Sequence, residues 1–190
     1  MHEYLNHRRQ PEILELVSEN SPVLREQCRR LTKDEILSAE IQNLIDDIKF
    51  TCSEKKTGVG LSANQVGKPV AISVVAIKPT PGRPNLEPFE KVCINTEITE
   101  TFGEKVPLWE GCQSTALDEN GEPAMAKVLR YEKVRIKYFD ESGEEQEEIV
   151  ESLVAHVIQH ETDHLNGILF TDLIDKADLI SYQEFSKLEK

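Results

Sequence analysis

Apolar residues recur at helical spacing in two stretches of the chain. In residues 35–50 they form one stripe made of Ile36, Leu37, Ile41, Leu44, Ile45 and Ile48. In residues 149–166 one face carries Ile149, Leu153 and Val157 and continues with His160 and His164. Gly167 follows at the position of a C-terminal cap. The pattern predicts two amphipathic helices, one in the first third of the chain and one near its end.

Between these stretches the composition changes to that of strands and turns. Val and Ile dominate residues 69–77, and residues 91–98 and 133–139 predict further strands. Four prolines in 78–88 predict a loop, and Asn-Gly within 118–122 predicts a turn. The acidic segment 141–148 is typical of a solvated hairpin end. Strands followed by a late helix predict an α+β fold.

Length and charge narrow the functional classes. The chain has 190 residues and a net charge of −13, which disfavours binding to nucleic acid or anionic lipid. The longest apolar run, 70–77, is too short to span a bilayer, and no secretory signal opens the chain. No repeat or composition shift divides it. We therefore expect one domain over residues 1–190, soluble and cytoplasmic, with neither a nucleic acid nor a membrane as partner.

The second predicted helix contains His160-Glu161-Thr162-Asp163-His164. Histidines four residues apart lie one above the other, about 6 Å along the helix axis, and can bind one metal ion. A Glu directly after the first His can act as general base on the metal's water. The alternative is a pair of surface histidines. It is disfavoured because both continue the apolar stripe, where unpaired imidazoles are costly to bury.

The third ligand decides the class of enzyme. His156 lies on the same face but about 12 Å from His164 along the axis, too far for one ion. The metzincin pattern is excluded because Phe170 occupies its third histidine position. Glu184 has the spacing of a thermolysin-like ligand, and Cys112 would complete a Cys-His-His site. The remaining cysteines, which form no Cys-x-x-Cys pair, are expected to be buried, reduced thiols: Cys28, Cys52 and Cys93.

Three segments together resemble the peptide deformylase family. They are Gly58–Gln65, Glu110–Ser114 and Gln159–His164, in the family's order, and weaker similarity covers about residues 11–180. The chain departs from the family pattern in four places in or near these motifs. Ser62 replaces an alanine, Gln113 and Thr162 each replace an apolar residue, and the segment 115–129 is longer than usual.

The resemblance implies a fold, a reaction and a cofactor. The fold would be α+β, with small β-sheets packed around a central metal-binding helix and a further N-terminal helix. The reaction would be hydrolytic removal of the N-formyl group from the N-terminal methionine of new polypeptides. The cofactor would be one divalent ion, Fe²⁺ in the cell, although the same ligands accommodate Zn²⁺, Ni²⁺ or Co²⁺. The partner would be an N-formylmethionyl peptide, including nascent chains at the ribosome, and the protein would be a monomer.

The resemblance also implies roles for individual residues. Cys112, His160 and His164 would bind the metal, and Glu161 would be the general base. The Gln65 side chain and the Gln113 backbone N–H would donate to the developing oxyanion. Glu110 would pair with Arg130 and brace the cysteine loop. The substrate would contact Gly58, Val59, Gly60, Gly111, Leu153, His156 and Val157.

Two other functions remain open at this level. A zinc endopeptidase would use Glu184 as third ligand, so that its loss, and not the loss of Cys112, would release the metal. A non-catalytic deformylase-like protein would bind formyl-peptides without releasing formate. The presence of Glu161 argues against the second alternative.

Overall fold

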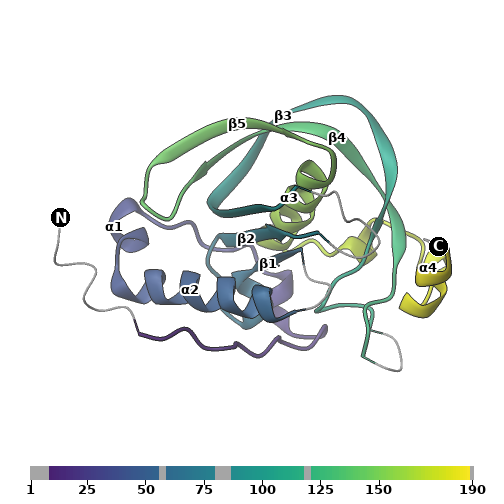
Figure 1. Ribbon diagram of the computed structural model, residues 1–190, viewed down its shortest axis with the longest axis horizontal. Coiled ribbons are helices and arrows are strands. Elements are labelled where there is room, and N and C mark those ends of the chain that lie inside the picture. The colour runs from purple at the N-terminus through teal and green to yellow at the C-terminus, as the bar shows by residue number, and fades with distance from the viewer. Residues whose placement is uncertain (1–8, 56–58, 80–86, 118–120, 189–190) are drawn as a thin grey trace.

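The computed structural model describes residues 9–55, 59–79, 87–117 and 121–188 (Figure 1). Within these ranges a five-stranded antiparallel sheet is combined with α-helices, which confirms the α+β prediction. The strands are β1 (Gly60–Ser62), β2 (Ile72–Ile77), β3 (Phe89–Glu110), β4 (Ala126–Phe139) and β5 (Glu145–Glu151). The helices are α1 (Lys33–Ile36), α2 (Ala39–Glu54), α3 (Ser152–Leu165) and α4 (Tyr182–Leu188).

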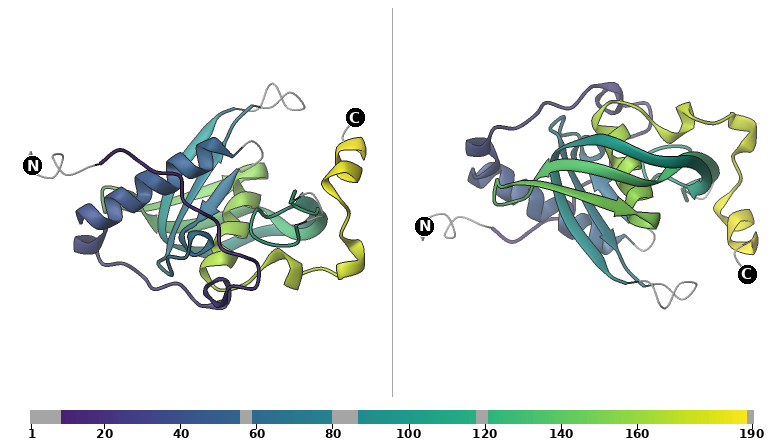
Figure 2. Two further views of the ribbon diagram at one scale, coloured as in Figure 1. Left: turned by 90° about the horizontal axis from the view of Figure 1, so that it is seen from below. Right: turned by 90° about the horizontal axis from the view of Figure 1, so that it is seen from above.

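The strands follow one another across the sheet in chain order and form one continuous sheet. Residues 89–94 of β3 pair with β2, and residues 94–110 pair with β4. Three register shifts interrupt the β3–β4 ladder, the first between Ile94 and Glu97. Because such irregularities increase bending and twist, the long hairpin curves over α3 in Figures 1 and 2. The central helix predicted from the resemblance is thus enclosed by a single bent sheet.

The first predicted helix is divided in two by capping. The Thr32 hydroxyl accepts a hydrogen bond from the Glu35 N–H and opens α1, and the Ser38 hydroxyl accepts one from the Ile41 N–H and opens α2. Ser and Thr side chains favour such N-cap positions over helix interiors. The prediction of one helix over 35–50 was therefore wrong at both ends. The helical stretch breaks before α2, and α2 continues to Glu54.

The second predicted helix begins three residues late. Residues 149–151 complete β5, where Val150 pairs with Val134 of β4. Alternating burial in β5 shows that period-two pairing prevails over the helical spacing at this point. The backbone then turns at Ser152, with a φ of 56°, into α3. The hairpin end predicted over 141–148 is correspondingly shorter: its turn joins Asp140 to Glu144.

The helix α3 ends as predicted at Gly167. This glycine has a φ of 72°, and its N–H donates to the His164 carbonyl, while the Ile168 N–H donates to the Asp163 carbonyl. The predicted strands 69–77, 91–98 and 133–139 correspond to β2 and to parts of the longer β3 and β4. Most of the predicted loop 78–88 and of the turn 118–122 lies outside the described residues.

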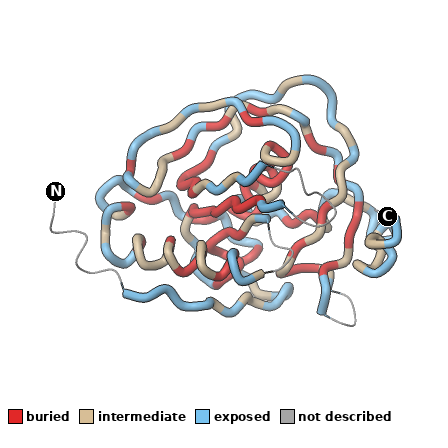
Figure 3. The backbone as a smooth tube through the Cα atoms, in the orientation of Figure 1, coloured by how far each residue is buried: buried red, intermediate tan, exposed pale blue. Residues whose placement is uncertain are grey.

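The strand β2 is buried on both faces because a helix covers each (Figure 3). Ile72 and Val74 face α2, where they join an apolar cluster with Ile45 and Ile48. Val75 and Ile77 face α3 in a second cluster. Because β2 is packed between the two helices, α3 is held against the sheet. This packing fixes the positions of the α3 side chains. No helix in the described part of the chain is long and apolar enough to span a membrane.

Candidate metal centre

Cys112, His160 and His164 come together between the end of β3 and the helix α3. One potential ligand atom from each lies within 4.8 Å of the others, and His164 Nε2 is 3.3 Å from Cys112 Sγ. A tetrahedral ion with ligands at 2.0–2.3 Å keeps its donor atoms roughly 3.3–3.8 Å apart. The three side chains therefore fit one metal ion and leave a fourth position for water or substrate.

The charges in this group favour a metal-binding form. Although burial raises it, the pKa of the Cys112 thiol lies well below its usual range because of the neighbouring imidazoles of His164 and His160. The thiolate is the form of cysteine that binds metals. Burial lowers the pKa of His160, but hydrogen bonding to Cys112 and Glu110 raises it well above its usual range.

Glu110 holds His160 from behind. Its Oε2 lies 2.8 Å from His160 Nδ1, which leaves Nε2 of that ring for the metal. Arg130 donates to both Glu110 oxygens, at 2.6 and 3.2 Å, which confirms the predicted Glu110–Arg130 pair. A carboxylate behind a ligating histidine fixes its tautomer and ring orientation. Burial opposes ionisation of Glu110, yet hydrogen bonds from His156, His160 and Arg130 hold its pKa well below the usual range.

His156 and Asp163 extend this network. His156 is buried, and its Nε2 lies 2.7 Å from Glu110 Oε1. Asp163 accepts a hydrogen bond of 2.5 Å from Arg130 Nη1. The sequence indicated neither contact, because a helical wheel places His156 on the metal-facing stripe without showing the strand residue opposite it. These groups come together only because β3 pairs with β4 and α3 packs against them in the folded chain.

Glu161, the predicted general base, is 3% exposed beside the ligands. Its Oε2 accepts a hydrogen bond of 2.6 Å from the Ser62 hydroxyl. Burial, the largest cause, raises the pKa of the Glu161 carboxyl, and the positive charges at His160 and His164 oppose this rise. A side chain at Gly60 would overlap the same carboxylate, so the absence of a Cβ at that position makes room for Glu161.

Gln65, one of the two predicted oxyanion donors, lies next to the cysteine. Gln65 is buried, and its Nε2 lies 3.5 Å from Cys112 Sγ and 3.1 Å from Ser114 Oγ. Its Oε1 accepts a hydrogen bond from the Ser62 N–H, so the amide NH₂ is directed toward the cysteine. Gln113 is half-buried immediately after Cys112. The structure thus brings Gln65 to the metal group.

The predicted substrate-contacting residues have different surroundings. Val59 is exposed next to the edge strand β1, whereas Gly58 lies outside the described residues. Gly111 is packed so closely against Met125 that a Cβ there would overlap the methionine sulfur. On α3 the predicted pocket residues are half-buried Leu153 and buried Val157 and His156.

Glu184 does not belong to the metal group. It lies in α4, and its carboxylate accepts hydrogen bonds from the Ser181 N–H and hydroxyl, an N-terminal cap. Among the described residues the only group of three potential ligands is Cys112, His160 and His164. The thermolysin-like arrangement considered from sequence spacing is therefore wrong, since a local capping interaction accounts for the acid at that distance.

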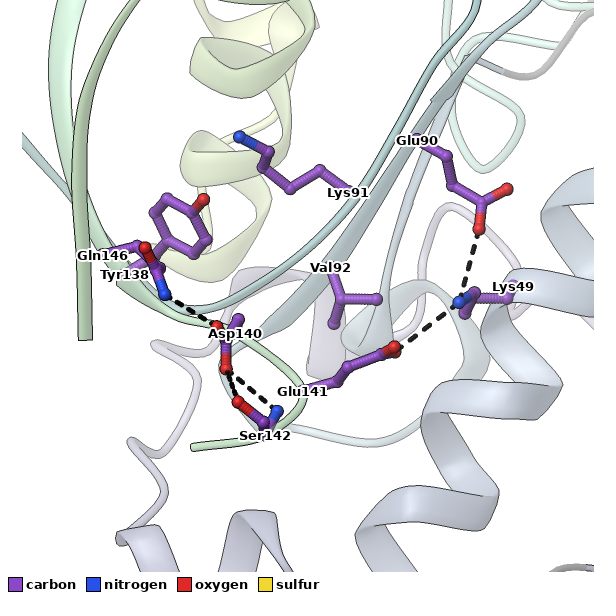
Figure 4. Close-up of a pocket in the computed structure, with 9 residues that line it drawn as sticks. All are labelled: Lys49, Glu90, Lys91, Val92, Tyr138, Asp140, Glu141, Ser142 and Gln146. Atoms are coloured by element: carbon purple, nitrogen blue, oxygen red, sulfur yellow. Dashed lines mark hydrogen bonds and ion pairs between the residues drawn. The ribbon is translucent and has the colours of Figure 1, made fainter. Parts of the chain in front are cut away.

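A separate cavity of about 410 Å³ lies beyond the other end of β4 (Figure 4). Lys49 extends into it from α2 and pairs with Glu90 and Glu141. Lys91 pairs with Glu148 and lies over the Tyr138 ring. The described residues that line it include no cysteine or histidine, so this cavity has none of the chemistry of the metal group.

A buried Cys-His-His group with an adjacent glutamate defines a mononuclear metal hydrolase. A model of the polypeptide deformylase family matches residues 13–179. The chain is 32% identical to peptide deformylase 2 of Nostoc sp., over 94% of this chain and 96% of the relative. It is 37% identical to the peptide deformylase of Aquifex aeolicus, over 83% and 89% of the two chains.

The solved structures agree. A class I type b peptide deformylase from Acinetobacter baumannii with Met-Ala-Ser bound is similar with a TM-score of 0.78 and 31% identity. The similarity covers 86% of this chain and 99% of that one. The chain belongs to the polypeptide deformylase family, whose members are hydrolases that remove the N-formyl group from new polypeptides.

Proposed function

We propose that this chain removes the formyl group from N-formylmethionyl peptides, with Cys112, His160 and His164 holding one divalent ion. The observation that carries the proposal is the buried Glu161 carboxylate beside this ligand group. A general base must lie within hydrogen-bonding reach of the proton that it removes. Glu161 follows one ligand directly in the sequence and shares the α3 turn with both histidines.

Each residue has a distinct role in this proposal. Held by the three ligands, a divalent ion would make a water molecule nucleophilic at neutral pH. Glu161 would take the proton from the attacking water and transfer it to the leaving amine. The raised pKa of the Glu161 carboxyl, caused by burial, suits this role, because it makes the carboxylate a stronger proton acceptor.

The formyl oxygen gains negative charge during the attack. The Gln65 NH₂ and the Gln113 backbone N–H would donate hydrogen bonds to it. Gln65 is supported by its direction, since the Ser62 N–H holds its carbonyl end and leaves the NH₂ facing the cysteine. Loss of one such donor typically costs about 10²–10³ in rate.

The substrate peptide would add to the sheet at β1. This strand lies at the edge of the sheet and pairs on one side only, with β2. An extended peptide can hydrogen-bond to such an edge. Val59 and Gly60 would contact its backbone, together with Gly58 and Gly111. Leu153 and Val157 would border the methionine side chain, next to His156.

We also propose Fe²⁺ as the ion in the cell, although Zn²⁺, Ni²⁺ and Co²⁺ suit the same donors. We further propose a cytoplasmic location, which the four free cysteines support, and no direct binding of nucleic acid, which the net charge of −13 supports. From membership of the family we propose a monomer that acts on nascent chains at the ribosome.

The decisive experiment measures formate release from formyl-Met-Ala-Ser. The protein is purified without oxygen, loaded with Fe²⁺ or Ni²⁺, and compared with Glu161→Gln. We expect turnover by the wild type and a loss of at least about 10²-fold in the variant, with the metal retained. A metal-loaded wild type that binds the peptide without releasing formate would contradict the proposal.

Two further variants test the ligand set. Cys112→Ala is expected to lose the metal, because it removes one of three donors. Glu184→Gln serves as the matched control and is expected to keep both metal and turnover, since its carboxylate caps α4. The opposite pattern would restore the endopeptidase hypothesis.

A further inference from the structure

Ser62 connects the two side chains to which the proposed reaction assigns proton transfer and oxyanion binding. It is fully buried at the end of β1. Its hydroxyl lies 2.6 Å from Glu161 Oε2, and 3.3 Å from the Glu161 carbonyl oxygen. Its backbone N–H donates to Gln65 Oε1 at 2.8 Å. One residue thus contacts Glu161 through its side chain and Gln65 through its backbone.

We propose that Ser62 is a positioning residue, whose hydroxyl holds the Glu161 carboxylate in the orientation needed to accept the proton of the attacking water. This inference rests on the proposed deformylase function. Ser62 touches neither substrate nor metal in this role and acts through Glu161 alone. Its N–H orients Gln65 whatever the side chain at position 62, so the two contacts can be separated experimentally.

The register of the sheet explains how Ser62 reaches the helix. Ser62 pairs with Ser73 of β2, and directly opposed residues of an antiparallel pair have side chains on the same face. That face of β2 carries Val75 and Ile77, which pack against α3. The Ser62 hydroxyl is therefore directed at α3, one turn of which carries Glu161.

The Ser62 hydroxyl is the donor that meets the Glu161 carboxylate in this position. Gly60, two residues earlier on the same face of β1, leaves room for the carboxylate but donates nothing from a side chain. Among the described residues, one hydrogen bond to the Glu161 carboxylate is found, and it comes from Ser62. A buried carboxylate without a donor is costly, so removing the hydroxyl destabilises this position of the carboxylate.

Ser62→Ala is the variant that isolates the hydroxyl contact. Alanine fills nearly the same volume but has no hydroxyl. The substitution therefore removes the contact with the smallest change in packing.

The test compares steady-state formate release from formyl-Met-Ala-Ser by Ni²⁺-loaded wild type and Ser62→Ala. We expect kcat to fall about five- to thirtyfold with KM within about twofold, since a contact to the general base acts in the transition state. Metal content and Tm should match the wild type. Ser62→Thr keeps the hydroxyl, suits a strand, and should recover most of the lost kcat.

Ser73→Ala is the matched control. Ser73 is equally buried on the neighbouring strand, but its hydroxyl bonds to the Cys93 carbonyl and not to Glu161. We expect its kcat to equal that of the wild type. If the alanine variant at position 62 is too unstable to assay, Ser62→Cys preserves the volume with only a weak S–H donor and is expected to lose kcat in the same way.

The outcomes separate this inference from the reaction itself. Wild-type turnover that disappears in Glu161→Gln establishes the reaction, and a metal-loaded wild type without turnover overturns both proposals. An active wild type with a Ser62→Ala kcat within twofold overturns the positioning role alone. So does a kcat loss that follows lost metal or lowered Tm, or one that Ser73→Ala reproduces.

Discussion

The Glu161 carboxylate lies closely against two residues of β1, Gly60 and Ser62, on one face of the strand. Such packing leaves it little choice of position. A methyl group at residue 60 would occupy the space of the carboxylate, and the buried side chain would have to move away from its hydrogen bond. The identity of residue 60 therefore matters to the general base as well as to a bound peptide.

Gly60→Ala is accordingly expected to lower kcat for formyl-peptide by at least about tenfold, because it displaces the proton acceptor. Gly103→Ala is a useful comparison. Nothing lies within 4 Å of its Cβ position, although its φ of 72° adds backbone strain far from the site. Steady-state kinetics with metal analysis would decide the question. A Gly60→Ala enzyme with normal kcat and raised KM would instead assign the glycine to peptide binding alone.

The cysteines differ sharply in their expected reactivity. Burial raises the pKa of Cys28 to about 11, and those of Cys52 and Cys93 to about 12. These thiols remain protonated at pH 8, so they are poor nucleophiles, and their thiolates form only as the pH approaches 11–12. The Cys112 pKa is lowered instead.

Alkylation at pH 8, followed by mass spectrometry, should therefore modify one cysteine in the metal-free native protein, namely Cys112. The metal-loaded protein should be protected there, and the denatured protein should react at all four cysteines. Reaction of Cys28 or Cys93 before Cys112 in the native protein would contradict these assignments.

At the level of single residues, the sequence predicted what depends on residue type and local spacing. Two histidines one helical turn apart indicate a metal whatever the fold. Cys112 could not be chosen over Glu184 by spacing, because the third ligand comes from another element. The resemblance selected it, and the geometry then grouped it with the histidines. The contacts of Ser62 with Glu161 and of His156 with Glu110 were not predictable, because each joins a strand to α3.

Among the elements, β4 and α3 are joined by a buried ion pair. Arg130 of β4 lies between Glu110 at the end of β3 and Asp163 of α3. The Arg130 and Glu110 side chains are 7% and 3% exposed, so water cannot replace either partner. The pair therefore fixes the cysteine loop relative to the helix that carries both histidines.

Arg130→Leu should lower the free energy of unfolding by about 3–5 kcal/mol, because it leaves the Glu110 charge buried without its cation. It should also weaken metal binding by about 10–100-fold, since Glu110 orients His160. Urea unfolding and metal competition would measure both effects.

Arg135→Leu, on the same strand, is the matched control for that comparison. Arg135 forms partly exposed pairs with Glu100 and Glu147, and such pairs contribute about 0–1 kcal/mol. Equal losses in the two variants would show that the Arg130 network has no special role.

The helices and strands were predictable where the sequence follows either the helical or the strand pattern and not both. The α3 core and its glycine cap followed from helical spacing, and β2 followed from its Val and Ile content. The errors lay at boundaries. Ser38 interrupts one helix by capping the next, and Ile149 and Val150 satisfy the helical and the strand pattern equally. For Ile149 and Val150, pairing with β4 selects the strand, and this pairing is known only from the tertiary structure.

At the scale of the whole molecule, the chain has two regions that differ in what stabilises them. Around β2, α2 and α3 pack on opposite faces through two large apolar clusters. Residues 110–117 and 121–126 lie at a smaller cluster, which includes Cys112 and Phe170. A backbone bridge between Met125 and Ile180 and the contact of Trp109 with Phe185 attach the C-terminal segment to it (Figure 1).

A metal ion would connect these two regions, since one ligand lies in the second region and two lie on α3. Removing it leaves the apolar clusters intact but deletes one of the links between the cysteine loop and α3. A ligand that binds only the folded state stabilises the parts of the structure that its binding residues connect. Chelation should therefore loosen the molecule locally and not uniformly.

Hydrogen exchange before and after chelation measures this directly. We expect exchange to increase at least about tenfold in residues 110–117, 121–126 and 176–182, while amides of β2 and α2 keep their protection. Cys112→Ala should reproduce the pattern without a chelator, because it removes the ligand on the cysteine-loop side. Exchange that increases equally in β2 would instead mean that the ion stabilises the whole fold, and that the apolar clusters around β2 are insufficient without it.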